Sequence, residues 1–120
     1  MLYLLLIYTN EDDAPEPGTP EQATMWAEYG AYSDSAERRG ILVDGKALHP
    51  STTATTIRVR NGETLTSDGP YAATAEQLGG IYVVDVSDLD EAIDAAAGIP
   101  GARHGAIEVR PIIGTVRVPA

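Results

Sequence analysis

The stretch Ser67-Asp68-Gly69-Pro70-Tyr71 continues through residues 72–78 to Gly79-Gly80 and the apolar run Ile81–Val86. It joins a dense turn signal to the clearest buried-strand pattern in the chain, because Asp, Gly and Pro each favour turn conformations. We therefore expect residues 68–71 to lie at the mouth of a central strand. Side chains on a rigid turn at such a place can form a site.

Two earlier segments predict the first half of an α+β domain. Met1–Tyr8 is a nearly continuous apolar run of strand length, as expected of a central strand. Thr19-Pro20-Glu21-Gln22 predicts a helix start, since Thr can cap, Pro suits the first turn and Gln completes a capping box. A helix is thus expected over residues 20–39, ended by Gly40. Its apolar stripe comprises Met25, Trp26, Tyr29, Tyr32 and Ala36.

The middle of the chain predicts a short strand and a hairpin. Ile41–Val43 is expected to be extended and to be followed by a turn at Asp44-Gly45. Thr55–Arg60 alternates apolar and charged residues, and Asn61-Gly62 is a strong two-residue hairpin signal. The chain should therefore return along Glu63–Thr66 in a half-exposed hairpin.

The last third predicts a second strand–helix–strand unit. Ala73–Leu78 is expected to form a short helical turn before the strand at 81–86, and Asp88 caps the next helix. Ala106–Pro111 predicts a final strand, and Ile112–Ala120 either an edge strand or a mobile tail. The apolar stripe of the second helix is Leu89, Ala92, Ile93 and Ala96. This order predicts an α+β, ferredoxin-like sandwich with a mainly antiparallel sheet and two helices on one face. A homodimer would cover the other face.

Composition limits the classes of function. A chain of 120 residues with 43% apolar residues suits one domain, and the absence of cysteine removes thiol chemistry and disulfides. The net charge of −10, from 18 acidic and 8 basic residues, disfavours nucleic-acid binding. The short apolar N-terminal run is followed by acidic residues, which favours a buried strand over a signal peptide or membrane span. We therefore expect a cytoplasmic protein of residues 1–120 that binds neither nucleic acid nor membrane.

Asp68 and Tyr71 are the first candidates for chemistry. The simplest interpretation is a turn, since Asp forms Asx-turns and Pro fixes the backbone. The functional alternative is a carboxylate base and a phenol donor held above a strand, with His49 as a third acid–base group. The simpler interpretation of His49 is an exposed or structurally bonded loop residue, which is favoured over the functional one, and His104 is expected to face solvent.

A second set of residues is predicted to bind a ligand. Glu108 and Arg110 alternate with apolar residues on the last strand, and they either form an outward polar face or point into a cleft beside Asp68. Glu76 and Tyr82 complete the ligand-binding set. No spacing typical of a metal site or a phosphate-binding loop occurs, so no metal and no cofactor are expected.

The chain resembles the DGPF branch of the YCII-related proteins. The resemblance is carried by Asp68-Gly69-Pro70-Tyr71 with the following Glu76-Gln77-Leu78-Gly79-Gly80, by Leu48-His49-Pro50 and by Ile107-Glu108-Val109-Arg110-Pro111. It extends over nearly the whole chain, as a single YCII-related/DGPF-like domain. It implies a dimeric α+β barrel of ferredoxin-like subunits and no settled reaction. Some members are encoded beside extracytoplasmic-function sigma factors, and relatives include a dehydrochlorinase.

The departures from the family pattern restrict what can be carried over. The Phe of the signature is Tyr71 here, and Ala73-Thr74-Ala75-Glu76 replaces the usual Glu-Thr-Lys-Glu. The His and Asp proposed for the YciI-like branch have no counterparts on the first helix or near Gly98–Gly101, so that site does not transfer.

Two hypotheses of function follow. The first is a homodimer that binds a small organic molecule, as a cofactor-free lyase or isomerase with Asp68, Tyr71 and His49 as acid–base groups and Arg110 pairing an anion. The alternative is a non-catalytic regulatory or interaction module associated with a sigma factor.

Overall fold

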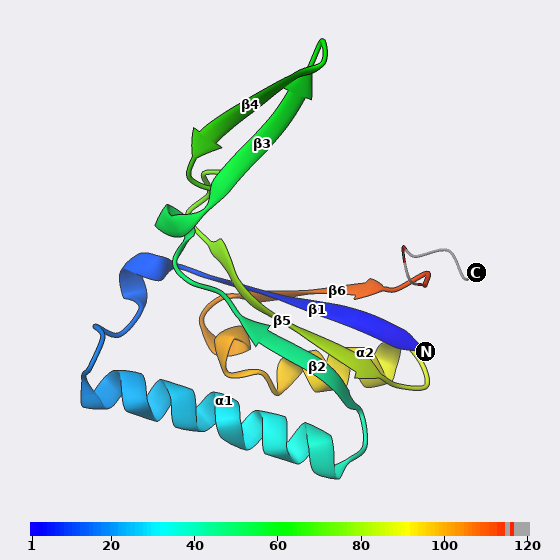
Figure 1. Cartoon of the computed structure of the whole chain (residues 1–120). Coiled ribbons are helices and arrows are strands. Elements are labelled where there is room, and N and C mark those ends of the chain that lie inside the picture. Colours follow the sequence, from blue (N-terminus) through cyan, green and yellow to red (C-terminus); the bar gives the residue numbers. More distant parts are fainter. Residues whose placement is uncertain (115, 117–120) are drawn as a thin grey trace.

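The computed structural model of this chain describes residues 1–114 and residue 116. Two strand–helix–strand units are separated by a hairpin (Figure 1). The strands are β1 (Leu2–Thr9), β2 (Leu42–Ala47), β3 (Thr55–Arg60), β4 (Glu63–Asp68), β5 (Gln77–Asp85) and β6 (Ala106–Pro111); the helices are α1 (Pro20–Arg38) and α2 (Leu89–Ala97); the 3-10 turns are η1 (Glu11–Asp13), η2 (Ser51–Thr53) and η3 (Pro100–Arg103).

Four of the strands form one antiparallel sheet in the order β2-β5-β1-β6. Both helices lie against the same face of this sheet (Figure 1). This is the ferredoxin-like α+β sandwich that the order of elements predicts. Among the described residues no helix covers the opposite face of the sheet, which we call the open face.

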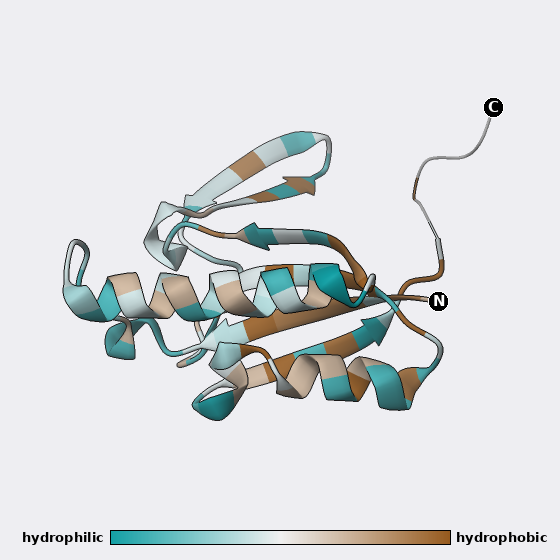
Figure 2. Cartoon of the chain, turned by 90° about the horizontal axis from the view of Figure 1, so that it is seen from below, coloured by the Kyte–Doolittle hydropathy of each residue, from teal (hydrophilic) through white to brown (hydrophobic). Residues whose placement is uncertain are grey.

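The hydrophobic core lies between the sheet and the helices. Alternate residues Tyr3, Leu5 and Ile7 of the central strand β1 point into it, as the strand period of two requires. Tyr82 and Val84 of β5 lie beside them. In Figure 2 the apolar strands lie behind the two helices. The intervening residues of β1 and β5 therefore face the open side of the sheet.

The predicted helices are confirmed, with changes in which residues they bury. Thr19 caps α1, accepting from the Gln22 amide at 3.3 Å, and the Gln22 side chain accepts from the Gly18 amide at 2.9 Å. Trp26, expected in the buried stripe, is about half exposed. In α2 the buried residues are the small Ala92, Ala95 and Ala96, whereas Leu89 and Ile93 are half exposed. The helix therefore packs closely through alanines.

Two local predictions were wrong. The Asp44-Gly45 turn does not form, because β2 continues to Ala47 and accommodates an irregularity of register between Leu42 and Asp44. The helical turn expected at Ala73–Leu78 is a bend, and β5 begins at Gln77. Pairing with β1 overrides the local preference there. The edge strand or tail expected at Ile112–Ala120 lies partly outside the described residues, since residues 115 and 117–120 are not among them.

The hairpin of β3 and β4 is a separate two-stranded sheet. It projects away from the side of the main sheet that carries the helices (Figure 1). Asn61 and Gly62 both have positive φ, 51° and 75°, as a type I′ turn requires, so the predicted hairpin signal is confirmed. Ile57 and Val59, which are 56% and 58% exposed, lie on one face of the hairpin.

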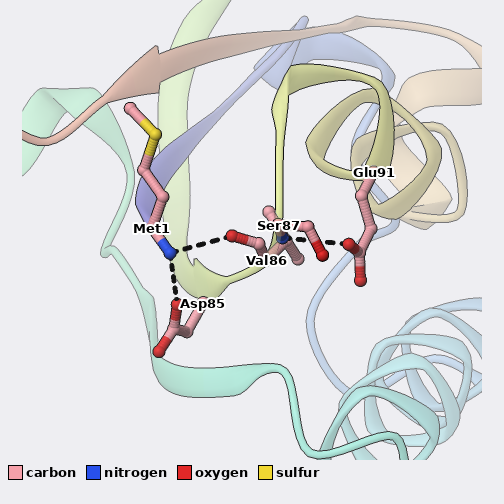
Figure 3. A network of polar contacts seen from close by, with 5 residues as sticks. All are labelled: Met1, Asp85, Val86, Ser87 and Glu91. Carbon is pink, nitrogen blue, oxygen red and sulfur yellow. Dashed lines mark hydrogen bonds and ion pairs between the residues drawn. The ribbon is translucent and has the colours of Figure 1, made fainter.

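A small polar network closes the end of the sheet nearest α2 (Figure 3). The Met1 nitrogen lies 2.8 Å from Asp85 Oδ1 and 2.9 Å from the Val86 carbonyl oxygen. The Ser87 amide donates to Glu91 Oε2 at 2.9 Å, while the Asp88 side chain accepts from the Glu91 amide. This arrangement is similar to a capping box at the start of α2, except that Glu91 accepts from the amide of the residue before the cap.

Candidate functional site

Asp68 and Tyr71 lie at the base of the hairpin. Asp68 ends β4, and Gly69 follows with φ 98°, a conformation that glycine adopts without strain. The Gly69 amide donates to the Ala54 carbonyl at 2.8 Å, and Thr56 Oγ1 donates to the Gly69 carbonyl at 2.9 Å. These bonds hold the turn against the start of β3, as the turn interpretation of this segment expects.

Tyr71 is turned outward from this base. It is 80% exposed, and the guanidinium carbon of Arg58 lies 5.3 Å from its ring centroid, within the range of a cation–π contact. Asp68, His49 and Glu76 are also exposed. Asp68 is the last residue of β4, and the other three lie in the two connections between the hairpin and the main sheet. In a single subunit they line an open surface.

The other three predicted residues lie on the main sheet, on opposite faces. Tyr82 is buried beneath the helices, with its hydroxyl 2.8 Å from Ser33 Oγ and its ring 5.1 Å from that of Tyr32. Glu108 and Arg110 are exposed on β6, across from Leu6 and Leu4 of the open face. One small ligand cannot contact both Tyr82 and this pair.

Glu108 and Arg110 also pair with each other. Arg110 Nε donates to Glu108 Oε2 at 2.7 Å, and both side chains remain largely exposed. A surface pair of this kind contributes little to stability. The guanidinium therefore remains accessible to another anion.

A cavity of about 370 Å³ lies elsewhere, between the start of α1 and η3. None of the seven predicted site residues lines it. Its polar lining includes Arg103 and His104 at the end of η3 and Glu28 and Tyr29 on α1. The full lining is Thr9, Asn10, Asp13, Ala14, Pro15, Glu21, Thr24, Met25, Glu28, Tyr29, Pro100, Arg103 and His104. The volume is within the range of small-molecule sites.

The path of the chain explains why these side chains meet. β1 ends at Thr9 beside the start of β6, and η3 leads into β6 directly. Gly105 makes this close approach possible, because a Cβ there would lie 2.2 Å from the Tyr8 carbonyl oxygen. Arg103 and His104 are thus held at the end of the sheet, next to the first turns of α1.

Tyr29 forms the inner wall of the cavity. Burial raises the pKa of its phenol above the usual 10.0, although a hydrogen bond from the Gly101 backbone opposes the shift. The phenol is therefore protonated at neutral pH. The phenol lines the cavity, so its oxygen can donate that proton in a hydrogen bond to a group bound there. A Cβ at Gly101 would lie 2.8 Å from that oxygen, so only glycine fits there.

Arg103 and Glu28 form an ion pair at the rim. Arg103 Nε also donates to the Pro100 carbonyl at 3.3 Å. On the far side of this pair a second, more open hollow runs between the helices, lined in part by Arg39 and Asp94. The pair therefore separates two hollows, and the Arg103 guanidinium can contact a ligand in either.

Sequence reasoning missed this cavity. His104 was predicted to face solvent, and it is exposed, but it also borders the cavity. The signal was the placement of Arg103-His104 between two glycines directly before the last strand. Among residues 1–114 and 116 no group of three or more His, Asp or Glu side chains is arranged to hold a metal ion. In the same residues no helix is long and apolar enough to cross a membrane.

The fold defines the class of this protein as a ferredoxin-like α+β domain with a hairpin inserted between β2 and β5. The comparison with protein families is specific: the chain belongs to the YCII-related domain family, which it matches over residues 1–115. It is also similar to the uncharacterized protein R00369 of Rhizobium meliloti (strain 1021). The two are 37% identical over 114 residues, which cover 93% of this chain and 92% of the relative.

Proposed function

We propose that this YCII-related protein is a homodimer that binds a small organic acid and carries out proton transfer without a cofactor, as a lyase or an isomerase. The observation that carries the proposal is the cavity beside α1, where an imidazole, a guanidinium and a protonated phenol border one space. A site of this size with a few converging polar groups suits a small ligand.

The three groups suit different parts of such a ligand. The Arg103 guanidinium would bind a carboxylate, sharing its donors between the ligand and Glu28. The His104 imidazole would act as the acid–base group, the role in catalysis that histidine fills most often. The Tyr29 hydroxyl would donate to an oxygen that gains negative charge in the reaction. Together they provide recognition, proton transfer and stabilisation of charge.

A homodimer is supported by the open face of the sheet. Its central residues are apolar and partly exposed, and they pair across the strands, Leu4 with Val83 and Leu6 with Ile81. A second copy packed on this face would remove them from water.

The hairpin base is a second candidate place for the acid–base groups. Asp68 and Tyr71 flank Gly69, which is hydrogen-bonded to Ala54 and Thr56, while His49 and Glu76 lie in the connections on either side of the hairpin; all four are open to solvent in one subunit. They would serve as base and donors only if a partner subunit enclosed them. If the site is at the hairpin base, the likeness of Asp68–Tyr71 to the DGPF signature supports it, and Arg110 would be the residue that binds the anion.

The test compares matched variants for retention of a ligand. Native mass spectrometry of protein purified from its own cells should show a dimer with a bound small molecule. Arg103→Ala and His104→Ala should reduce the bound fraction at least tenfold, since each removes a direct contact. His49→Ala, which removes an imidazole outside the cavity, is the control. If Asp68→Ala abolishes retention while the cavity variants keep the ligand, the hairpin base is the site and the cavity is not.

A non-catalytic role is the second candidate. The net charge of −10 and the exposed apolar residues of the hairpin favour a contact with a basic protein, and the sequence resemblance suggests a sigma factor. Capture of such a partner by the purified chain, with no small molecule retained, would support this role against the first.

A further inference from the structure

The β3–β4 hairpin does not bury its own apolar face within one subunit. Ile57 and Val59 stand on that face beside their cross-strand partners Thr66 and Thr64, and both are more than half exposed. An isolated two-stranded hairpin is only marginally stable in water. Something should therefore cover this face.

The base of the hairpin fixes its direction. The bonds from Gly69 to Ala54 and from Thr56 to Gly69 tie the two strands to the turn that follows β4. The Arg58 guanidinium stacks on Tyr71 at the same level. The hairpin is thus held out on the side away from the helices (Figure 1), which is the side of the open face.

The open face alone is too small for a stable dimer interface, and the hairpin can supply the missing area. Four strands about 4.8 Å apart and six residues long at about 3.3 Å per residue present roughly 400 Å² in projection. A standard interface buries about 800 Å² on each partner. The hairpin, with two strands of six residues, adds about 200 Å² for each of its faces. In a two-fold dimer each subunit buries this area twice. It buries one face of its own hairpin against the partner, and it buries an equal area where the partner's hairpin covers it.

Charge favours the same occupant. The hairpin, residues 55–68, contains Arg58, Arg60, Glu63 and Asp68, a formal charge of zero. Since the whole chain carries −10, the rest of the chain carries all of this charge. The hairpin is therefore the part of the chain that a second copy repels least, whereas the two acidic bodies repel each other.

We propose that in the homodimer each hairpin lies along the partner subunit, with the Ile57 and Val59 face buried against the edge of the partner's open sheet face. The Asp68–Tyr71 turn then lies at the boundary between subunits, so groups of both chains border it. This inference rests on the homodimer proposed above. It adds that the partner subunit supplies part of the surface around Asp68.

The first test is the strength of the dimer, measured by sedimentation equilibrium. Ile57→Ser with Val59→Ser should raise the dissociation constant about a hundredfold, because four buried apolar side chains are lost per dimer. Leu65→Ser is the matched control, since Leu65 is 44% exposed on the opposite face of the hairpin. It should change the constant less than threefold. Circular dichroism melting verifies that the variants remain folded.

The second test locates the hairpin directly. The chain has no cysteine, so Thr64→Cys gives one site for a benzophenone crosslinker on the apolar face. Chains of natural isotope content that carry the crosslinker are mixed with ¹⁵N chains that lack it and irradiated. Crosslinks that join the hairpin to ¹⁵N peptides of β1, β2 or β5 support the inference. Crosslinks confined to the chain that carries the crosslinker overturn it, as do dimers without crosslinks.

The outcomes separate this inference from the proposed homodimer. A wild-type chain that sediments as a monomer overturns both. A stable dimer that is insensitive to the Ile57 and Val59 changes overturns only the position of the hairpin. Crosslinking of a monomeric chain to a different protein would overturn the inference in favour of the regulatory role.

Discussion

Replacing Tyr32 by phenylalanine tests how the two helices are joined. The Tyr32 hydroxyl donates to the Ala95 carbonyl at 2.7 Å, in a buried position. That carbonyl lies in the last turn of α2, where helical partners run out. The variant loses one hydrogen bond and leaves a buried acceptor unpaired, so the free energy of unfolding at pH 7 should fall by about 1.5 kcal/mol. For a domain of this size the melting temperature should fall by about 6 °C.

The same variant should behave differently at alkaline pH. Burial raises the pKa of Tyr32 from 10.0 to about 12. Above pH 10 the phenol ionises in the unfolded chain but not in the folded one, so the wild type loses stability as pH rises from 10 to 12. Reduced for screening by solvent, this loss is about 2 kcal/mol. The phenyl ring of the variant cannot ionise, so the difference between the two proteins should shrink or reverse in that window.

Urea denaturation at pH 7 and at several values between about 9.5 and 11.5 measures both effects, because this range lies around the ordinary pKa of tyrosine. Tyr71→Phe is the control, because it makes the same change of side chain at a position that is 80% exposed. A Tyr32→Phe protein as stable as the wild type at pH 7 would contradict the hydrogen-bond argument. A difference that stays constant over the whole alkaline range would contradict the burial argument.

The remaining predictions concern the cavity wall and the start of α2. Gly105→Ala should lower the free energy of unfolding, measured by urea denaturation, by about 3 kcal/mol, because its Cβ would lie 2.2 Å from the Tyr8 carbonyl oxygen. A variant as stable as the wild type would show that the backbone between η3 and β6 can shift to make room. Glu91→Gln should flatten the acid limb of the stability curve. The hydrogen bonds from Ser87 lower the pKa of Glu91 below 4.5, so its contribution is present above that pH and lost as pH falls; an unchanged limb in acid titration would exclude this role.

Elements with strong local signals could be predicted from the sequence. The cap at Thr19 and the Asn61-Gly62 turn are satisfied by residues within four positions, so their chemistry is visible in the sequence. The alternation that positions Tyr3, Leu5 and Ile7 in the core is equally local. Together these signals were sufficient to predict the ferredoxin-like order of elements.

Features that depend on distant contacts could not be predicted. Asp44-Gly45 has turn chemistry, but pairing with β5 keeps it extended. The cavity joins α1 to η3, and the paired Glu28 and Arg103 are 75 positions apart along the chain. The candidate residues around Asp68 come from the end of β4 and from the two connections of the hairpin, and whether they form one site stays a prediction. Residues 81–86 are apolar at nearly every position, so the sequence does not show which face of β5 packs against the helices. Tyr82 was predicted to bind a ligand, and it lies on the face that the helices cover.

The order β2-β5-β1-β6 also has a consequence for how the chain folds. The central strand β1 pairs with β5 and β6, whose partner residues lie much later in the chain, for example Tyr3 with Val84 and with Pro111. Among the described strands only β3 and β4 are joined by a tight turn, so the hairpin can form within microseconds while the main sheet must await its last strand. Such high contact order predicts folding in milliseconds to seconds. The β3–β4 hairpin would then form first, and the main sheet around β1 would be completed last.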